Sequence, residues 1–256
     1  MALEFRHVSK SFGGRDGGSL LAVDDVSFRV EEGEFVSVVG PSGCGKSTIL
    51  SMTAGLYQPT EGEVLVSEER VTGPNTHVGF MLQKDLLLPW RSIIHNIEFG
   101  LESRGVPRAQ RRERAMRELA HCHLEGFENH FPYQLSGGMR QRAALARTLA
   151  IDPEIILLDE PFSALDAQTK LLLQNSFAGT IKEAGKTTLL ITHDLSEAVL
   201  MSDRILVLSE RPGQIIAEIT VDLPHRDKPI KRRLMPEVGD YAAQLFKHLK
   251  LEEKAA

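Results

Sequence analysis

Apolar positions along this 256-residue chain form two kinds of strand pattern. The largely apolar runs 35–39, 155–158 and 187–192 have the length and composition of strands buried on both faces of a parallel sheet. The alternating run 3–8 and the run 20–30 predict strands of an antiparallel layer. We therefore expect an α/β fold with a mixed, mainly parallel sheet and an N-terminal antiparallel β-layer beside it.

Helical patterns separate these strands. Ser92 stands where it can cap a helix over 93–101, and Pro107 stands where it can open a helix over 108–122. Because that second helix alternates charged and apolar positions, we expect a solvated outer face. Further helices are predicted over 143–150, 167–184, 195–201 and 241–251.

Length and composition indicate how many domains the chain forms. A length of 256 residues with 42% hydrophobic and 25% charged residues suits one large α/β domain. We place that domain at 1–220, with an α-helical subdomain inserted over approximately 84–152. Residues 221–256 are expected to form a helical tail.

Charge, cysteines and hydropathy exclude several classes of protein. A formal net charge of −5 argues against a general nucleic-acid binder, and two cysteines are too few for a disulfide framework. No run approaches the ~18 consecutive apolar residues that a membrane-spanning helix needs, and residues 1–6 lack the plan of a signal peptide. We expect a cytosolic protein that can still dock on a membrane partner.

One stretch carries a phosphate-binding motif. Between the strand 35–39 and a predicted helix stands Gly40-Pro41-Ser42-Gly43-Cys44-Gly45-Lys46-Ser47-Thr48, a match to G-x-x-x-x-G-K-[ST] in its strand–loop–helix context. The glycines let the backbone point N–H groups at an anion, Lys46 supplies a charge for the β- and γ-phosphates, and Ser47 supplies a hydroxyl ligand for Mg²⁺. A glycine-rich turn that only joins strand to helix is the alternative. We expect a nucleoside triphosphate site.

Four polar residues follow other predicted strands. Asp159 ends the strand 155–158 and is placed to hold Mg²⁺, and Glu160 beside it is a natural general base for an attacking water. Gln83 could bind Mg²⁺ or orient water, and His193 could donate a hydrogen bond to the γ-phosphate. Because parallel strands end at one edge of a sheet, we expect these side chains to gather near the phosphates.

A second anion site is predicted at another helix start. Ser136, Gly137 and Gly138 place a hydroxyl and backbone amides ahead of a long helix. One nucleotide does not need two such cradles. A second copy of the chain could bring its own cradle to the γ-phosphate, so this pattern points to a dimer.

Taken in order, these motifs resemble those of the ATP-binding subunits of ABC transporters over roughly the first 210 residues. The resemblance departs in two places, with Met139 where glutamine is commonest and Phe12 where the adenine-stacking aromatic is often tyrosine. The matching elements are the Walker A motif 40–48, the Q-loop Gln83, the signature Leu135-Ser136-Gly137-Gly138-Met139, the Walker B motif 155–159, the catalytic glutamate Glu160, the D-loop Ser163-Ala164-Leu165-Asp166 and the switch histidine His193.

The resemblance carries further expectations about cofactors and partners. It implies ATP and Mg²⁺ as ligands, a head-to-tail homodimer, two transmembrane permease subunits and, indirectly, an extracytoplasmic solute-binding protein. It implies a peripheral position at the cytoplasmic face of the cell membrane. The stretches 83–91 and 209–213 resemble the importers of nitrate, aliphatic sulfonates and taurine. The apolar loop 86–90 is the candidate docking surface, with burial inside the helical subdomain as the alternative.

Two other functions stay open. A soluble ABC-type ATPase acting on nucleic acid or ribosomes would usually carry two cassettes, a coiled-coil insertion or zinc modules, and this chain has one cassette, no heptad run and no zinc cysteines. A P-loop kinase acting on a small molecule would leave residues 136–139 and His193 without a role. The leading hypothesis is an ATP-hydrolysing subunit of an importer.

Overall fold

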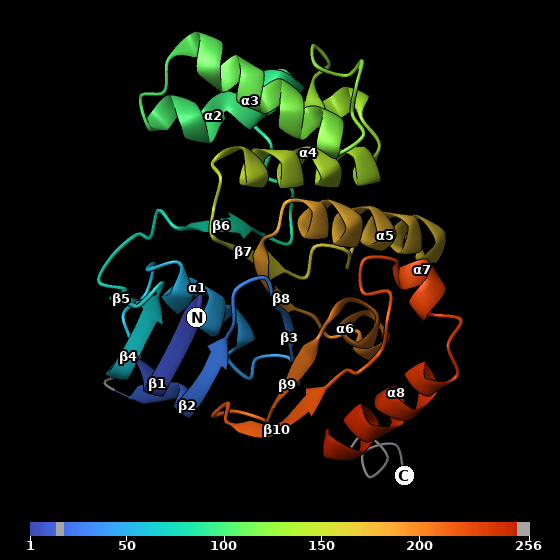
Figure 1. The fold of residues 1–256 in the computed structure, drawn as a ribbon. Helices are drawn as coiled ribbons and strands as arrows, with labels where there is room; N and C mark the ends of the chain where they lie inside the picture. Colours follow the sequence, from blue (N-terminus) through green and yellow to red (C-terminus); the bar gives the residue numbers. More distant parts are fainter. Residues whose placement is uncertain (14–17, 250–256) are drawn as a thin grey trace.

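The computed structural model describes residues 1–13 and 18–249, which are built around two β-sheets (Figure 1). The larger sheet has six strands in the order β10-β9-β3-β8-β7-β6, in which all neighbours are parallel except β9 and β10. Its central strands β3 and β8 are buried at every residue, as their apolar sequences predict. The strands are β3 (Phe35–Val39), β6 (Val78–Met81), β7 (Ile155–Asp159), β8 (Thr187–Ile191), β9 (Arg204–Leu208) and β10 (Ile215–Thr220).

The smaller sheet is the antiparallel layer, with strand order β2-β1-β4-β5. The prediction of a strand over 3–8 was too short, because pairing with β2 continues to Gly13. A glycine-rich stretch over 13–19 separates the runs 3–8 and 20–30 in the sequence, and its residues 14–17 lie outside the described part of the chain. Helix α1 lies between the two sheets and buries Ile49, Leu50 and Met52. These elements are β1 (Leu3–Gly13), β2 (Ser19–Val30), β4 (Glu61–Val66), β5 (Glu69–Arg70) and α1 (Lys46–Thr53).

The insertion between β6 and β7 is helical, as predicted. The prediction for its last helix was wrong at the start, because the helix begins at Gly137 instead of residue 143. Ser136 caps it, and the Ser136 hydroxyl accepts a hydrogen bond from the Met139 amide at 3.3 Å. No helix in the described part of the chain has both the length and the hydropathy to cross a bilayer. The helices are α2 (Ile93–Ser103), α3 (Arg108–His121), η1 (Pro132–Gln134) and α4 (Gly137–Ala150).

The C-terminal segment packs on the core through a buried arginine. Arg232 is 1% exposed and donates hydrogen bonds to the carbonyls of Val199, Leu200 and Ser202, which lie at the end of α6. The last helix begins at Glu237, four residues before the predicted start, and ends at His248. The helices of this half are α5 (Ala167–Glu183), α6 (Leu195–Met201), α7 (Pro229–Arg232) and α8 (Glu237–His248).

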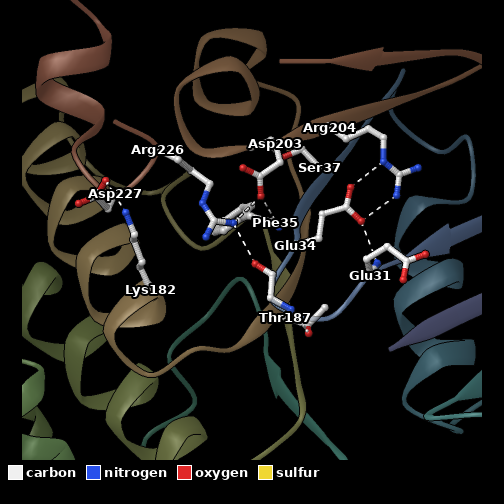
Figure 2. A network of polar contacts seen from close by, with 12 residues as sticks. Glu31, Glu34, Phe35, Ser37, Lys182, Thr187, Asp203, Arg204, Arg226 and Asp227 are labelled. Atoms are coloured by element: carbon white, nitrogen blue, oxygen red, sulfur yellow. Dashed lines mark hydrogen bonds and ion pairs between the residues drawn. The ribbon is translucent and has the colours of Figure 1, made fainter. Parts of the chain in front are cut away.

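A polar network ties the C-terminal segment to the amino ends of the central strands (Figure 2). Arg226 pairs with Asp203 at 2.6 Å, and the same carboxylate accepts the backbone N–H of Phe35 at the start of β3. Asp227 pairs with Lys182 of α5 at 3.2 Å. The segment after β10 is therefore fixed to both the sheet and a flanking helix.

The candidate functional residues lie at the opposite edge of the sheet. The P-loop follows β3, and loops that carry His193, Glu160 and Gln83 follow β8, β7 and β6. Because β3 also neighbours β9, the loop 209–214 after β9 lies on the other side of the P-loop. Strand order thus brings five loops to one edge, where an α/β sheet binds its ligands.

Candidate functional site

The P-loop has the closed shape that its glycines predict. Gly43 and Gly45 adopt positive φ angles of 76° and 103°, which side chains with a Cβ rarely accept. Lys46 is buried, and its Nζ donates to the carbonyls of Gly40 and Pro41 at 2.8 and 2.9 Å. The ammonium group is thus held across the loop at the start of α1.

A cavity of about 330 Å³ opens over this loop. The aromatic ring of Phe12 lines it and meets the ring of Tyr57 edge-on at 5.3 Å, while Lys10 lies 5.1 Å from the Phe12 centroid. A ring fixed in this way offers a π-face to a planar base. The lining residues are Phe12, Leu20, Ala22, Ser42, Gly43, Gly45, Lys46, Ser47, Thr48, Glu160 and Arg211.

Ser47 and Asp159 face each other across the loop. The Ser47 hydroxyl donates to Oδ1 of Asp159 at 3.4 Å. Burial raises the pKa of the Asp159 carboxyl, and the neighbouring charge of Glu160 raises it further, while the Ser47 hydrogen bond and Lys46 oppose the shift. A cation bound at this carboxylate would relieve the repulsion. One carboxylate with one hydroxyl fits Mg²⁺, which is usually held by few protein oxygens together with substrate phosphates.

Glu160 and His193 also meet at this edge. Nδ1 of His193 lies 3.0 Å from Oε2 of Glu160. The Glu160 backbone has φ 46°, in the left-handed region, and its N–H donates to the Ile191 carbonyl at 2.9 Å. The turn after β7 is therefore pinned to β8, and it directs the carboxylate toward the histidine.

Gln83 is linked to Glu160 through the hydroxyl of Ser163. Its Nε2 donates to Ser163 Oγ at 3.1 Å, and Ser163 donates to the Glu160 carbonyl at 2.9 Å. Gln141 of α4 donates to the Gln83 carbonyl at 3.3 Å. Gln83 thus links the turn at Glu160 to the first half of α4.

The second predicted anion site, at residues 136–138, does not line the cavity over the P-loop. Gly138 packs on α5, where a Cβ would come within 3.2 Å of Thr169, and Asp166 caps α5 by accepting the Thr169 amide at 3.0 Å. Among the described residues, those that line the phosphate cavity include neither Asp166 nor any member of 136–138. The structure unites Phe12, the P-loop and Glu160 and separates them from the signature residues.

Sequence reasoning missed Arg211 and the support of the Phe12 ring by Lys10 and Tyr57. Arg211 lies in the loop after β9 and lines the cavity. The sequence offered one signal for it, because the stretch 209–213 resembles importer ATPases. Which strand lies next to the P-loop strand depends on long-range pairing, and no local pattern contains it.

This combination of a mainly parallel sheet, a P-loop between β3 and α1 and strand-end acids defines a P-loop nucleoside triphosphatase. The profile of the family described as ABC transporter matches residues 23–163, more than half of the chain. The chain belongs to this family and is an ABC transporter ATP-binding subunit, built as an ATPase domain. The predicted fold class is thereby confirmed.

Curated relatives and solved structures agree with this assignment. An uncharacterized ABC transporter ATP-binding protein of Methanocaldococcus jannaschii is 46% identical over 237 residues, which cover 93% of this chain and 87% of the relative. The taurine import ATP-binding protein TauB of Yersinia pestis is 45% identical over 205 residues and 80% of each chain. The ATP-binding cassette MJ0796, solved as a post-hydrolysis dimer bound to ADP and Pi, superposes with a TM-score of 0.73 at 34% identity, covering 86% of this chain and 99% of that one.

Proposed function

We propose that this chain is the ATP-hydrolysing subunit of an importer and works as a head-to-tail homodimer with two ATP molecules at the interface. One observation carries the proposal: the cavity over the P-loop and the signature residues 136–138 are separate within one chain. Ser136 is exposed, and its hydroxyl accepts only the Met139 amide among the contacts described. A second copy would supply this hydroxyl and the following amides to the γ-phosphate. The dimeric structure of MJ0796 supports a homodimer.

The chemistry follows from the side chains at the sheet edge. Residues 40–48 would bind the phosphates, and Phe12 would stack on the adenine. Ser47 and Asp159 would hold Mg²⁺, which neutralises charge on the β- and γ-phosphates, and Gln83 would complete its environment or orient water. Glu160 would accept the proton of the attacking water, and His193 would hold the carboxylate and contact the γ-phosphate. Asp166, in the D-loop of the partner copy, would also contribute to the nucleotide site.

The docking surface for the membrane partners is proposed at the start of α2. Trp90 is 72% exposed, whereas Leu87 is buried in the helical subdomain. The apolar loop 86–90 is therefore partly open for docking and partly buried inside the subdomain. Beside it lies a cavity of about 510 Å³, whose lining includes Trp90, His95, Arg111, Asn129 and Phe131. An exposed indole next to a hollow is a suitable anchor for a partner segment.

The proposed partners are two permease subunits and, indirectly, a solute-binding protein outside the membrane. This places the chain at the cytoplasmic face of the cell membrane. We propose a small oxyanion as the solute, of the nitrate, aliphatic sulfonate or taurine class. The similarity to TauB supports this class, as do the stretches 83–91 and 209–213.

A membrane pull-down followed by reconstitution tests the proposal. The tagged chain should recover two permease subunits from solubilised membranes, and the Trp90→Ala variant should recover less while binding ATP normally. In vesicles, ATP should drive uptake of labelled taurine, alkanesulfonate or nitrate. If the chain were retained by nucleic acid or ribosomes and not by membranes, the importer function would be wrong.

A further inference from the structure

The loop Ser209–Gln214 after β9 is built as a rigid unit. Ser209 Oγ donates within the loop to the carbonyls of Glu210 and Pro212 at 2.8 and 2.9 Å and accepts the Gln214 amide at 2.9 Å. The Ser209 amide donates to the Gln214 carbonyl at 2.9 Å and closes the loop at its base. A loop held by so many internal bonds presents its tip in one place.

Two contacts fix this loop against the nucleotide cavity. The Gly213 amide donates to the Ala22 carbonyl at 3.0 Å, and the Gly213 carbonyl accepts the Asp24 amide at 3.0 Å, so the loop pairs with β2. On its other side, a Cβ at Gly213 would lie 2.1 Å from the Cys44 carbonyl. Only glycine allows this approach to the P-loop.

Arg211 is the side chain that this loop presents. Its Nε donates to the Gly43 carbonyl at 3.0 Å, and its guanidinium lies so close over the P-loop that a Cβ at Gly43 would be 2.8 Å from Nη2. The side chain is exposed and lines the same 330 Å³ cavity as Lys46 and Phe12. Within the described residues, no carboxylate pairs with it.

An exposed guanidinium that has no carboxylate partner among the described residues, and that is held over a phosphate cradle, has a preferred ligand. Arginine presents several N–H donors in a planar fork that matches phosphate oxygens. One donor of Arg211 is used by Gly43, which fixes the orientation of the group and leaves the two terminal nitrogens available. Lys46, by contrast, is buried and donates to the carbonyls of Gly40 and Pro41. The two cations therefore contact different carbonyls of the P-loop.

We propose that Arg211 is a phosphate-binding residue of the ATP site, donating from its terminal nitrogens to the polyphosphate. This inference rests on the role of the P-loop given above. It adds a residue from outside the motifs 40–48 and 155–160 and assigns the loop 209–214 to the nucleotide site. The guanidinium limits how far the phosphates can shift along the mouth of the loop.

Nucleotide titrations of Arg211→Gln and Arg211→Lys test the proposal, at protein concentrations where the chain is monomeric. Arg211→Gln should weaken binding of ATP and ADP by roughly tenfold, the scale of a lost charge-assisted hydrogen bond, and weaken AMP binding much less. Arg211→Lys should retain part of the affinity. The salt dependence of ATP binding should be shallower in Arg211→Gln, because a cation is gone.

Arg104→Gln is the matched control. Its guanidinium also donates to backbone carbonyls, those of Ile151 and Thr76, at a site far from the cavity lining. The melting temperature without nucleotide should be similar for Arg104→Gln and Arg211→Gln, which separates binding from folding.

Two results would overturn the proposal. In the first, Arg211→Gln binds ATP and ADP with unchanged affinity. In the second, the variant is impaired only when the chain dimerises, so the guanidinium contacts the second copy instead of the phosphates. Lys46→Ala distinguishes a failure of the underlying site: if ATP binding survives in that variant, the P-loop is not the nucleotide site, whatever Arg211 does.

Discussion

The imidazole of His193 and the carboxylate of Glu160 lie 3.0 Å apart at the ends of two neighbouring parallel strands. Glu160 reaches this position from a left-handed backbone with φ 46°. That conformation costs a residue with a Cβ roughly 1–2 kcal/mol. Strain held at a strand end beside a phosphate cradle is consistent with a carboxylate placed for catalysis.

Replacing this carboxylate should separate ATP binding from turnover. Glu160→Gln keeps the shape and the contact to His193 but removes the proton acceptor, so we expect near-normal ATP affinity and phosphate release slowed at least ~100-fold. The variant should accumulate an ATP-bound dimer, measured by light scattering during size exclusion. Unchanged phosphate release would remove Glu160 as the general base.

The backbone strain at this position predicts an unusual order of stabilities. Because glycine adopts a positive φ without a Cβ penalty, Glu160→Gly should unfold with a free energy about 1 kcal/mol larger than Glu160→Ala. Chemical denaturation of the two variants without nucleotide measures the difference. Equal stability of the two, or a more stable alanine variant, would show that the turn stores no strain.

Asp159 should make stability depend on pH in a definite direction. Burial and the charge of Glu160 raise the pKa of this carboxyl, so the folded protein takes up the proton at a higher pH than the unfolded chain does. Protonation then stabilises the fold as the pH falls through the raised pKa, and the effect is complete below the unfolded value of about 3.9. The neutral Asp159→Asn variant should therefore be more stable than the wild type at pH 7, with the difference shrinking toward pH 4.

Nucleotide with magnesium should make the wild type more stable than Asp159→Asn. Mg²⁺–ATP should raise the melting temperature of the wild type and raise that of Asp159→Asn less, because the variant lacks the carboxylate that holds the ion. Thermal unfolding with ATP and EDTA, compared with ATP and Mg²⁺, gives the contribution of the metal. An equal magnesium effect in both proteins would contradict a role for Asp159 in holding the ion.

Arg232 should be a main anchor of the C-terminal segment. Arg232→Ala leaves several carbonyls at the end of α6 without a donor, so we expect a loss of about 3 kcal/mol and a melting temperature lower by several degrees. Arg233→Ala, at an exposed neighbouring residue, is the control and should change stability by under ~0.5 kcal/mol. If the two variants melt alike, the buried guanidinium is not an anchor.

Local sequence patterns predicted most elements of this fold. The bounds of α6 were predicted correctly, because Asp194 caps the helix. The helix predicted over 143–150 was too short at its start, although Ser136 to Gly138 were placed ahead of a helix, because glycines have low helix propensity. There the Ser136 cap and the packing of Gly138 on Thr169 outweigh that propensity.

The candidate site was predictable to the extent that its parts lie in motifs. The P-loop, Asp159 and Glu160 could be placed at one edge from strand ends alone. The left-handed turn at Glu160 and the position of Arg211 could not, because both depend on pairings between distant strands, β7 with β8 and β3 with β9. A single amino-acid sequence carries no local record of such neighbours.

The seven residues of α6 form a short rod with a different attachment at each end. Asp194, the residue after His193, caps its beginning, and Arg232 of the C-terminal segment holds its end. A displacement of one end therefore moves the other. Exchanging the segment after residue 221 between relatives should therefore change the basal rate of ATP hydrolysis. It would do so without altering any residue that touches the nucleotide.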